Sequence, residues 1–286
     1  MNKLAVLAKA IVDVFPELKF SALEIGAMPL EGESEPMHGL MSVFPSSHLY
    51  AFEPDEAICQ KMNASVPKNM TYIPKALGKE NGKATLYMTE DRTCYSLYEP
   101  NEEFCNLYWG MGGLRTADTA QIDTFTLDGL LESGEVAAPN AIKIDVQGAE
   151  LDIFRGGEKA LESTLFIVTE AEFAPLYKDQ PLFPDLFSYM KERGFMFHKF
   201  TSICGRNLVP VDFGRHANLG SQSLWSDAVF IPDIHTLPTL DSESLAKLAL
   251  FCVIYQSVDV TYHCLDLVDK KENTNLAESF MKILNS

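Results

Sequence analysis

The sequence has little of what marks a disulfide-bonded or metal-binding protein. Its six cysteines are scattered over 286 residues and include no Cys-x-x-Cys pair. Without such pairs the spacing predicts neither a disulfide framework nor a zinc site, and we expect no metal ion. Reduced thiols are typical of cytosolic proteins, so the cysteines favour a cytoplasmic location.

Basic residues are also scarce. Lys and Arg total 23 against 40 Asp and Glu, which gives a formal net charge of −17. A surface this acidic repels phosphate backbones and anionic lipid headgroups, so we expect neither nucleic acid nor a membrane as partner. A small neutral or cationic ligand fits this charge better.

Long apolar runs are missing too, and no stretch approaches the length that crosses a bilayer. The first twenty residues do not have the pattern of a signal peptide, because charges interrupt their apolar stretch and no small-residue cleavage site follows. Helical spacing instead places four apolar residues on one face of an amphipathic helix expected over residues 1–19, namely Leu4, Leu7, Ile11 and Val14.

Short apolar segments alternate with helical ones along most of the chain. The expected strands are residues 21–27, 48–54, 70–77, 141–146 and 165–173. Several are apolar throughout, as strands covered on both faces must be. Helical spacing appears at residues 55–66 and 183–194, and Gly194 suits the end of the second helix. This alternation predicts an α/β fold with an open, mostly parallel, doubly wound sheet.

Three regions depart from the alternation. Residues 195–203 and 223–232 have the composition of two strands without a helix between them, which predicts an antiparallel pair at one side of the sheet. Residues 78–123 form a long excursion, which we expect to contribute to a binding cleft. The tail is helical and contains "LAKLALFCVIYQSVDV", which is apolar on nearly all sides. We expect it to pack on the domain or on a partner subunit, through which a homodimer would form.

Carboxylates recur where the predicted parallel strands end. Four of the five strands end in acid, and these residues are Glu24, Glu53, Asp145 and the pair Glu170 and Glu172. One such acid is unremarkable, because acidic residues also stabilise helix N-termini. In a doubly wound sheet, however, ligands bind beyond the carboxyl ends of the strands. The recurrence of acid on this one edge therefore predicts a binding site.

The same edge discriminates between two cofactors. An acid that ends the second strand can hold ribose hydroxyls. NAD also needs a glycine turn for its pyrophosphate, but the turn here reads "GAMPLEGESEPMHG", with three glutamates and no G-x-G-x-x-G. S-adenosylmethionine has no phosphate and carries a sulfonium and an ammonium group. The acidic edge therefore favours S-adenosylmethionine over NAD.

The segment "AIKIDVQGAELDIFRGGEKAL" resembles the signature of FkbM-type methyltransferases, in which a Lys-Ile-Asp strand end is followed by Gly-Ala-Glu. The resemblance extends in order through "LEIGA", "YAFEPDEAICQKMN", "IPKALGKENGKATLYM", "TLDGLL", "EFAPLYKDQPLFPDL" and "LWSDAVF", from Ser21 to Pro232. It implies a class I, Rossmann-like methyltransferase that uses S-adenosylmethionine to methylate a hydroxyl of a sugar or small metabolite. The predicted organisation is an N-terminal helix (1–19), a methyltransferase domain (20–235) and a helical extension (236–286).

The resemblance also implies roles for individual residues. The ribose would lie against Glu53 and Pro54, and the methionine part of the cofactor would face Glu24, Gly26 and Ala27. The adenine would lie near Ala76 and Leu77. Asp145 would lie where the methyl group emerges, as both a cofactor-binding and a catalytic residue.

One motif departs from the family pattern. The family has an aspartate, then Ile-Gly-Ala-Asn and a further glycine, whereas this chain has Glu24 and then Met28-Pro29. A longer acidic segment follows before Met41. We therefore expect a reshaped cofactor loop.

Further residues are expected to face the methyl acceptor. They are Glu150, Glu170, Glu172 and Trp109, whose ring could stack on a substrate. Glu150 is expected to be mainly structural, because the helix dipole favours a carboxylate in a first turn whatever the function. The six histidines lie in no motif, and each is expected on the surface or in packing, including His38 and His216.

Two other functions stay open. The altered first motif is compatible with a catalytically silent cofactor-binding or scaffold protein of the same fold. An NAD-dependent oxidoreductase on a similar sheet is less favoured, because the glycine fingerprint is missing.

Overall fold

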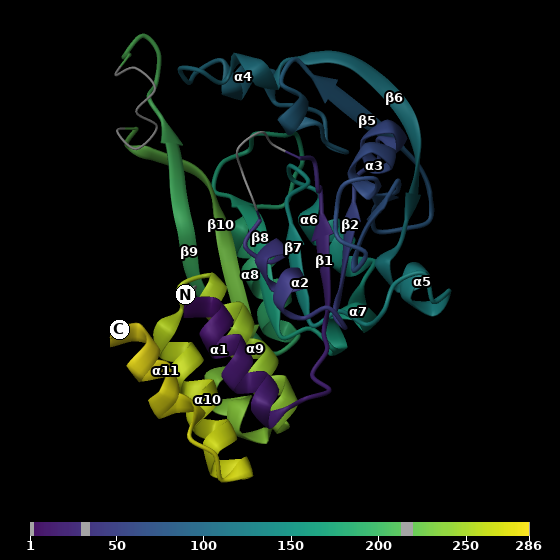
Figure 1. The fold of residues 1–286 in the computed structure, drawn as a ribbon. Helices are drawn as coiled ribbons and strands as arrows, with labels where there is room; N and C mark the ends of the chain where they lie inside the picture. The colour runs from purple at the N-terminus through teal and green to yellow at the C-terminus, as the bar shows by residue number, and fades with distance from the viewer. Residues whose placement is uncertain (1–2, 30–34, 213–219, 286) are drawn as a thin grey trace.

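A seven-stranded sheet forms the centre of the computed structural model, which describes residues 3–29, 35–212 and 220–285 (Figure 1). Its strand order is β3-β2-β1-β7-β8-β10-β9. The strands are β1 (Ser21–Ile25), β2 (His48–Phe52), β3 (Met70–Ile73), β7 (Ala141–Ile144), β8 (Phe166–Glu172), β9 (Phe195–Arg206) and β10 (Gln222–Pro232). The first five in this order are parallel, and β10 is antiparallel to both β8 and β9. The predicted doubly wound sheet and its antiparallel pair are therefore confirmed.

Helices cover both faces of the sheet, because its central strands are apolar on both sides. Leu23 and Ile142 belong to a core shared with one helical layer, which consists of α5 (Leu127–Glu132), α6 (Glu150–Arg155), α7 (Glu158–Glu162) and α8 (Phe183–Glu192). Ala22 and Ala141 belong to a second core on the other face. The helices that contribute to it are α1 (Lys3–Val14), α2 (His38–Val43), α3 (Glu56–Asn63), α9 (Ser242–Ile254), α10 (Val258–Glu272) and α11 (Leu276–Asn285).

The chain's first and last helices lie in one layer (Figure 1). Helix α1 contacts α9 and α11, and α9 also contacts β8 of the central sheet. The apolar tail segment is two helices rather than one, because α9 ends at Ile254 and α10 begins at Val258. Among the described residues, no helix has the length and apolar character needed to cross a membrane.

A second, smaller sheet occupies the long excursion. Its strands are β4 (Ala76–Leu77), β5 (Gly82–Thr89) and β6 (Thr116–Phe125), in the order β4-β6-β5. The prediction of one strand over residues 70–77 is wrong, because the segment forms two strands, β3 and β4. Pro74 lies between them and lacks the N–H that a strand interior needs. The excursion also contains α4 (Glu102–Cys105), and short 3-10 turns lie at Arg92–Cys94, Gly112–Leu114 and Ile234–Thr239.

Candidate active site

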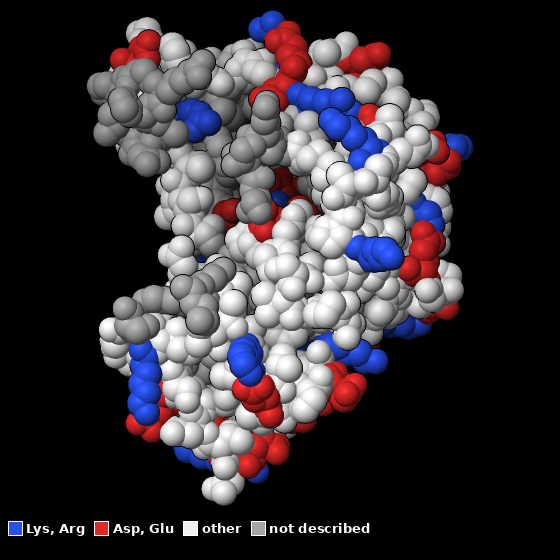
Figure 2. All heavy atoms as spheres, in the orientation of Figure 1, with Lys and Arg blue, Asp and Glu red and all other residues white. Residues whose placement is uncertain are grey.

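A cleft of about 630 Å³ opens at the carboxyl ends of β1, β2 and β7. Residues 24–29, 52–55 and 145–147 line it, as do residues 95–97 of the excursion. Figure 2 looks onto this face, where acidic side chains lie deep in a hollow between largely uncharged surfaces. The structure therefore brings Glu24, Glu53 and Asp145 into one cavity.

Gly26 joins two of the strand ends that form the cleft. Its φ is +80°, and a Cβ built there would lie 1.9 Å from the backbone oxygen of Asp145. The backbone N–H groups of Gly26 and Ala27 both donate to the carbonyl of Phe52 at the end of β2. Because no side chain fits between these backbones, glycine is required for the ends of β1 and β7 to meet.

Glu53 lies at the end of β2 with its carboxylate largely buried in the cleft wall. Its Oε1 accepts a hydrogen bond from the backbone N–H of Asp55 at 2.9 Å. Burial raises the pKa of Glu53, and that hydrogen bond opposes the rise. Ala76 and Leu77 line the same cavity and give it an apolar wall close to this carboxylate.

Glu24 is paired with a histidine that the sequence did not assign to the site. His38 begins α2, and its Nε2 lies 2.6 Å from Oε2 of Glu24, with both residues lining the cleft. Burial would lower the pKa of His38, but Glu24 and Glu35 outweigh burial and raise it. The expectation that His38 lies outside the site is therefore wrong. His216, for which a surface or packing role was also expected, lies outside the described residues.

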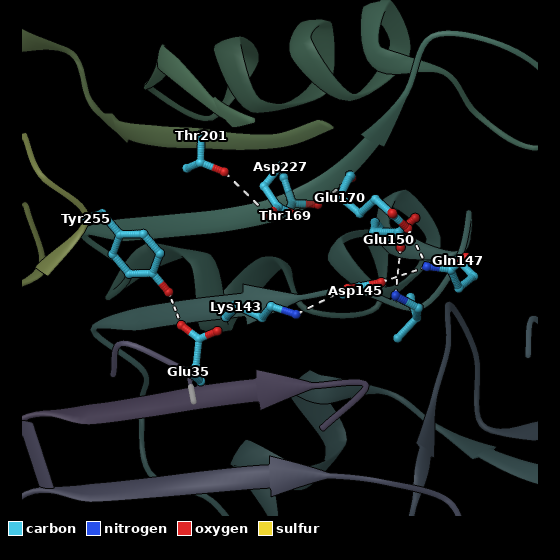
Figure 3. A network of polar contacts seen from close by, with 11 residues as sticks. Glu35, Lys143, Asp145, Gln147, Glu150, Thr169, Glu170, Thr201, Asp227 and Tyr255 are labelled. Carbon is cyan, nitrogen blue, oxygen red and sulfur yellow. Dashed lines mark hydrogen bonds and ion pairs between the residues drawn. The ribbon is translucent and has the colours of Figure 1, made fainter. Parts of the chain in front are cut away.

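Lys143 is a second residue that the sequence analysis missed. It lies in β7, lines the cleft, and places Nζ 3.3 Å from Oδ2 of Asp145 (Figure 3). The side chain is only 16% exposed. Burial would lower the pKa of Lys143, but four surrounding carboxylates raise it, and Lys143 is therefore a cation. These carboxylates are Asp145, Glu35, Asp227 and Glu24. A lysine within the otherwise apolar "AIKI" was the signal that could have identified it.

Asp145 combines exposure to the cleft with a fixed orientation. Its side chain is 34% exposed, and Oδ1 accepts a hydrogen bond from Nε2 of Gln147 at 2.9 Å. Burial would raise the pKa of Asp145, but the charge of Lys143 and the hydrogen bond from Gln147 outweigh it and lower the pKa. Asp145 is thus an ionised hydrogen-bond acceptor in the cavity.

The other three predicted acids, Glu150, Glu170 and Glu172, are buried and are not among the described residues that line the cleft. Both oxygens of Glu150 accept backbone hydrogen bonds, from Val146 at 2.8 Å and from Gly148 at 2.9 Å. Glu170 accepts from Gln147, while burial raises the pKa of Glu172 to about 7. Direct contact with a methyl acceptor, as expected for these residues, has no support in this geometry.

Trp109 also lies away from the described lining of the cleft. It is 39% exposed, and its backbone N–H donates to the carbonyl of Asn207 near the β9–β10 hairpin. The excursion instead presents Tyr95, Ser96 and Leu97 to the cavity. The excursion thus contributes to the cleft as expected, through Tyr95 and its neighbours rather than through Trp109.

Replacing Glu150 by glutamine should lower the free energy of unfolding by about 1–3 kcal/mol. Glu150 is only 4% exposed, and an amide nitrogen in place of one oxygen would face a backbone N–H donor. Urea unfolding measures the loss. Glu56→Gln, which changes a first-turn acid on the surface of α3, is the matched control and should cost no more than about 1 kcal/mol. Equal losses in both variants would contradict the buried role.

An acid-lined cleft at the carboxyl edge of a doubly wound sheet defines a class of proteins that bind nucleotide-like ligands at that edge. Within this class, the family model described as the methyltransferase FkbM domain matches residues 24–197, more than half of the chain. The chain belongs to the FkbM methyltransferase family.

Two curated relatives carry methyltransferase names. The chain is 29% identical over 125 residues to hexuronic acid methyltransferase AglP of Haloferax volcanii. The aligned region covers 43% of this chain and 47% of the relative. It is 29% identical over 147 residues to 2-O-methyltransferase NoeI of Sinorhizobium fredii. This aligned region covers 48% of this chain and 58% of the relative. The matched part is thus about half the length of each relative.

A solved structure of an FkbM methyltransferase from Methylobacillus flagellatus KT aligns with a TM-score of 0.40 at 14% identity. The alignment covers 74% of this chain and 43% of the other.

Proposed function

We propose that this protein uses S-adenosylmethionine to methylate a hydroxyl group of a sugar or another small metabolite. The observation that carries the proposal is the cleft of an FkbM-family chain in which Glu53, Gly26 and Asp145 converge from three strand ends. One relative is named a hexuronic acid methyltransferase and the other a 2-O-methyltransferase, and these names favour a sugar hydroxyl as the methyl acceptor.

The cavity fits this cofactor in size and chemistry. Its volume of about 630 Å³ lies within the range of small-molecule sites. Glu53 would bind the ribose hydroxyls, the apolar wall of Ala76 and Leu77 would hold the adenine, and acids near Gly26 would face the ammonium. When bound, the cofactor supplies a methyl group on a positively charged sulfur.

The chain's own residues would align the acceptor. Asp145 can accept a hydrogen bond from the acceptor hydroxyl and hold its proton as the new bond forms. Lys143 holds that carboxylate in place through their ion pair. Because methyl transfer needs little more than an aligned nucleophile, positioning is the main contribution expected of this site.

Glu53→Ala should weaken binding of S-adenosylmethionine by about 1.5–3 kcal/mol, or roughly 10–150-fold in Kd. The variant removes the charge-assisted hydrogen bonds proposed for the ribose. Isothermal titration calorimetry measures the change, and Glu56→Ala on the exposed side of α3 should bind like the wild type. A Glu53→Ala protein that binds as tightly as the wild type would exclude the ribose assignment.

Thermal shift separates the proposed function from its alternatives. A ligand that binds only the folded state raises the unfolding midpoint. We expect S-adenosylmethionine and its demethylated product to raise it and NAD to leave it unchanged. A silent scaffold would bind cofactor without transferring a methyl group. The cytoplasmic location and the homodimer through the C-terminal helices stay predictions.

A further inference from the structure

The residue after the loop Asp145–Val146 has an unusual backbone conformation. Gln147 has a φ of 60°, in the left-handed region that residues with a Cβ seldom adopt, and Gly148 follows with a φ of 101°. A Cβ at Gly148 would lie 3.2 Å from Nε2 of Gln180. Such a conformation persists only where surrounding contacts determine it, and such contacts cluster at functional sites.

The side chain of Gln147 supplies those contacts (Figure 3). Its Nε2 donates to Oδ1 of Asp145 at 2.9 Å and to Oε2 of Glu170 at 2.7 Å. Its Oε1 accepts from the hydroxyl of Tyr177 at 2.9 Å. Both amide protons are therefore donated to carboxyl groups, and the reverse orientation of the amide would place its oxygen against two acceptors.

Gln147 also contacts the excursion. Its backbone carbonyl accepts a hydrogen bond from Oγ of Ser96 at 2.6 Å, and both residues line the cleft. The hydroxyl of Tyr177, whose single proton lies nearer to the Gln147 amide oxygen, is also 3.2 Å from the carbonyl oxygen of Cys94 in the excursion. Gln147 thus contacts Asp145, Glu170 of β8 and Ser96 of the excursion.

The carboxyl groups around Gln147 lie close together, and its amide donates to two of them. Asp145, Glu150 and Glu170 each place one oxygen within 4.8 Å of the other two. Lys143 contacts Asp145, whereas Gln147 is the side chain that bridges Asp145 and Glu170. Burial raises the pKa of Glu150 and Glu170, whereas the hydrogen bond from Gln147 helps to lower that of Asp145. Without the amide, Oδ1 of Asp145 would lose this donor and its present orientation would no longer be fixed.

We propose that Gln147 is a positioning residue that holds the Asp145 carboxylate toward the methyl acceptor and couples it to the excursion. The proposal rests on the proposed function. A glutamate at this position keeps the shape but, when ionised, donates neither hydrogen bond and adds a further negative charge. When protonated, the same glutamate regains one O–H donor.

Gln147→Glu is therefore the informative variant. At about pH 8 its turnover should be roughly 10²-fold below the wild type, while its Kd for S-adenosylmethionine should stay within about threefold, because Glu53 and Gly26 are unchanged. Turnover should recover as the pH falls to about 5, relative to the wild type, as the introduced carboxylate takes up a proton. The titratable and charged groups around this position are Lys143 from β7, Asp145 just after β7, Glu150 from α6, Glu170 and Glu172 from β8, and Tyr177 and Cys94 from other segments.

The control is Gln60→Glu, which changes an amide that donates to Glu56 on the exposed side of α3. It should match the wild type in turnover at every pH. A Gln147→Glu protein with wild-type turnover, or with a loss that does not depend on pH, would overturn the positioning role.

A measurement without turnover separates this proposal from the proposed function. The unfolding midpoint of Gln147→Glu should fall relative to the wild type as the pH rises from about 5 to about 8, while that of Gln60→Glu should not. A wild type that binds S-adenosylmethionine but methylates neither sugars nor other small hydroxyl compounds would contradict the proposed function. A flat midpoint profile for Gln147→Glu would instead overturn the bridge between Asp145 and Glu170.

Discussion

Asp145→Asn should lower turnover by about 10²–10⁴-fold while the fold stays intact. The change keeps the shape of the side chain but removes the charge that is placed to accept the proton of the acceptor hydroxyl. It also removes the ionic partner of Lys143 at 3.3 Å, so the ammonium can turn toward other carboxylates. The measurement is the rate of labelled methyl transfer at saturating cofactor.

The pH dependence of this residue has a definite sign. Burial would raise the pKa of Asp145, but Lys143 and Gln147 lower it below the ordinary value. A lowered pKa in the folded state keeps the carboxylate charged below the pH at which an unperturbed aspartate takes up a proton, and the stability that it contributes is lost only as the pH falls further. The acid limb of the wild-type rate is therefore not expected to report Asp145.

The matched control for Asp145 is Asp123→Asn. Asp123 pairs with Lys83 at 2.8 Å on the exposed small sheet and is not among the described residues that line the cleft. Its replacement should therefore leave turnover unchanged. Full activity in Asp145→Asn would favour a purely structural carboxylate at the strand end.

Truncation before Asp241 should leave a protein that does not fold to a soluble form. The lost helix α9 buries seven apolar residues completely, and these are Leu245, Ala246, Leu248, Ala249, Leu250, Phe251 and Cys252. Each large one contributes about 1.5–3 kcal/mol, so their sum rivals the roughly 5–15 kcal/mol of a whole domain. The truncation would also expose the apolar face of the central sheet.

Removal of α11 alone is the graded control for this truncation. That helix buries Leu276, Ala277 and Phe280 against the same layer and contacts α1. We expect a soluble protein with a lower unfolding midpoint, measured by circular dichroism. A soluble, fully active protein that ends before Asp241 would contradict the role assigned to the C-terminal helices.

The central sheet could be predicted because its strands are short and apolar on both faces. Residues 21–25 and 141–144 are buried almost throughout, so composition alone marks them as strands. Chain order then places their carboxyl ends on one edge, which is why the acids Glu24, Glu53 and Asp145 could be grouped before the fold was known.

The remaining features depend on contacts between distant segments. Strands β5 and β6 are half exposed, so their pattern resembles a polar loop more than a buried strand. The pairing of His38 with Glu24 requires the turn into α2, which no local motif specifies. Glu170 and Glu172 are buried and are not among the described residues that line the cleft, and sequence position at a strand end does not reveal this.

Calorimetric titration of the wild type with S-adenosylmethionine, its demethylated product and NAD tests the central claim most directly. The cleft described above predicts saturable binding of the first two ligands at one site, weakened by Glu53→Ala, and no binding of NAD. Binding of NAD without binding of S-adenosylmethionine would contradict the account.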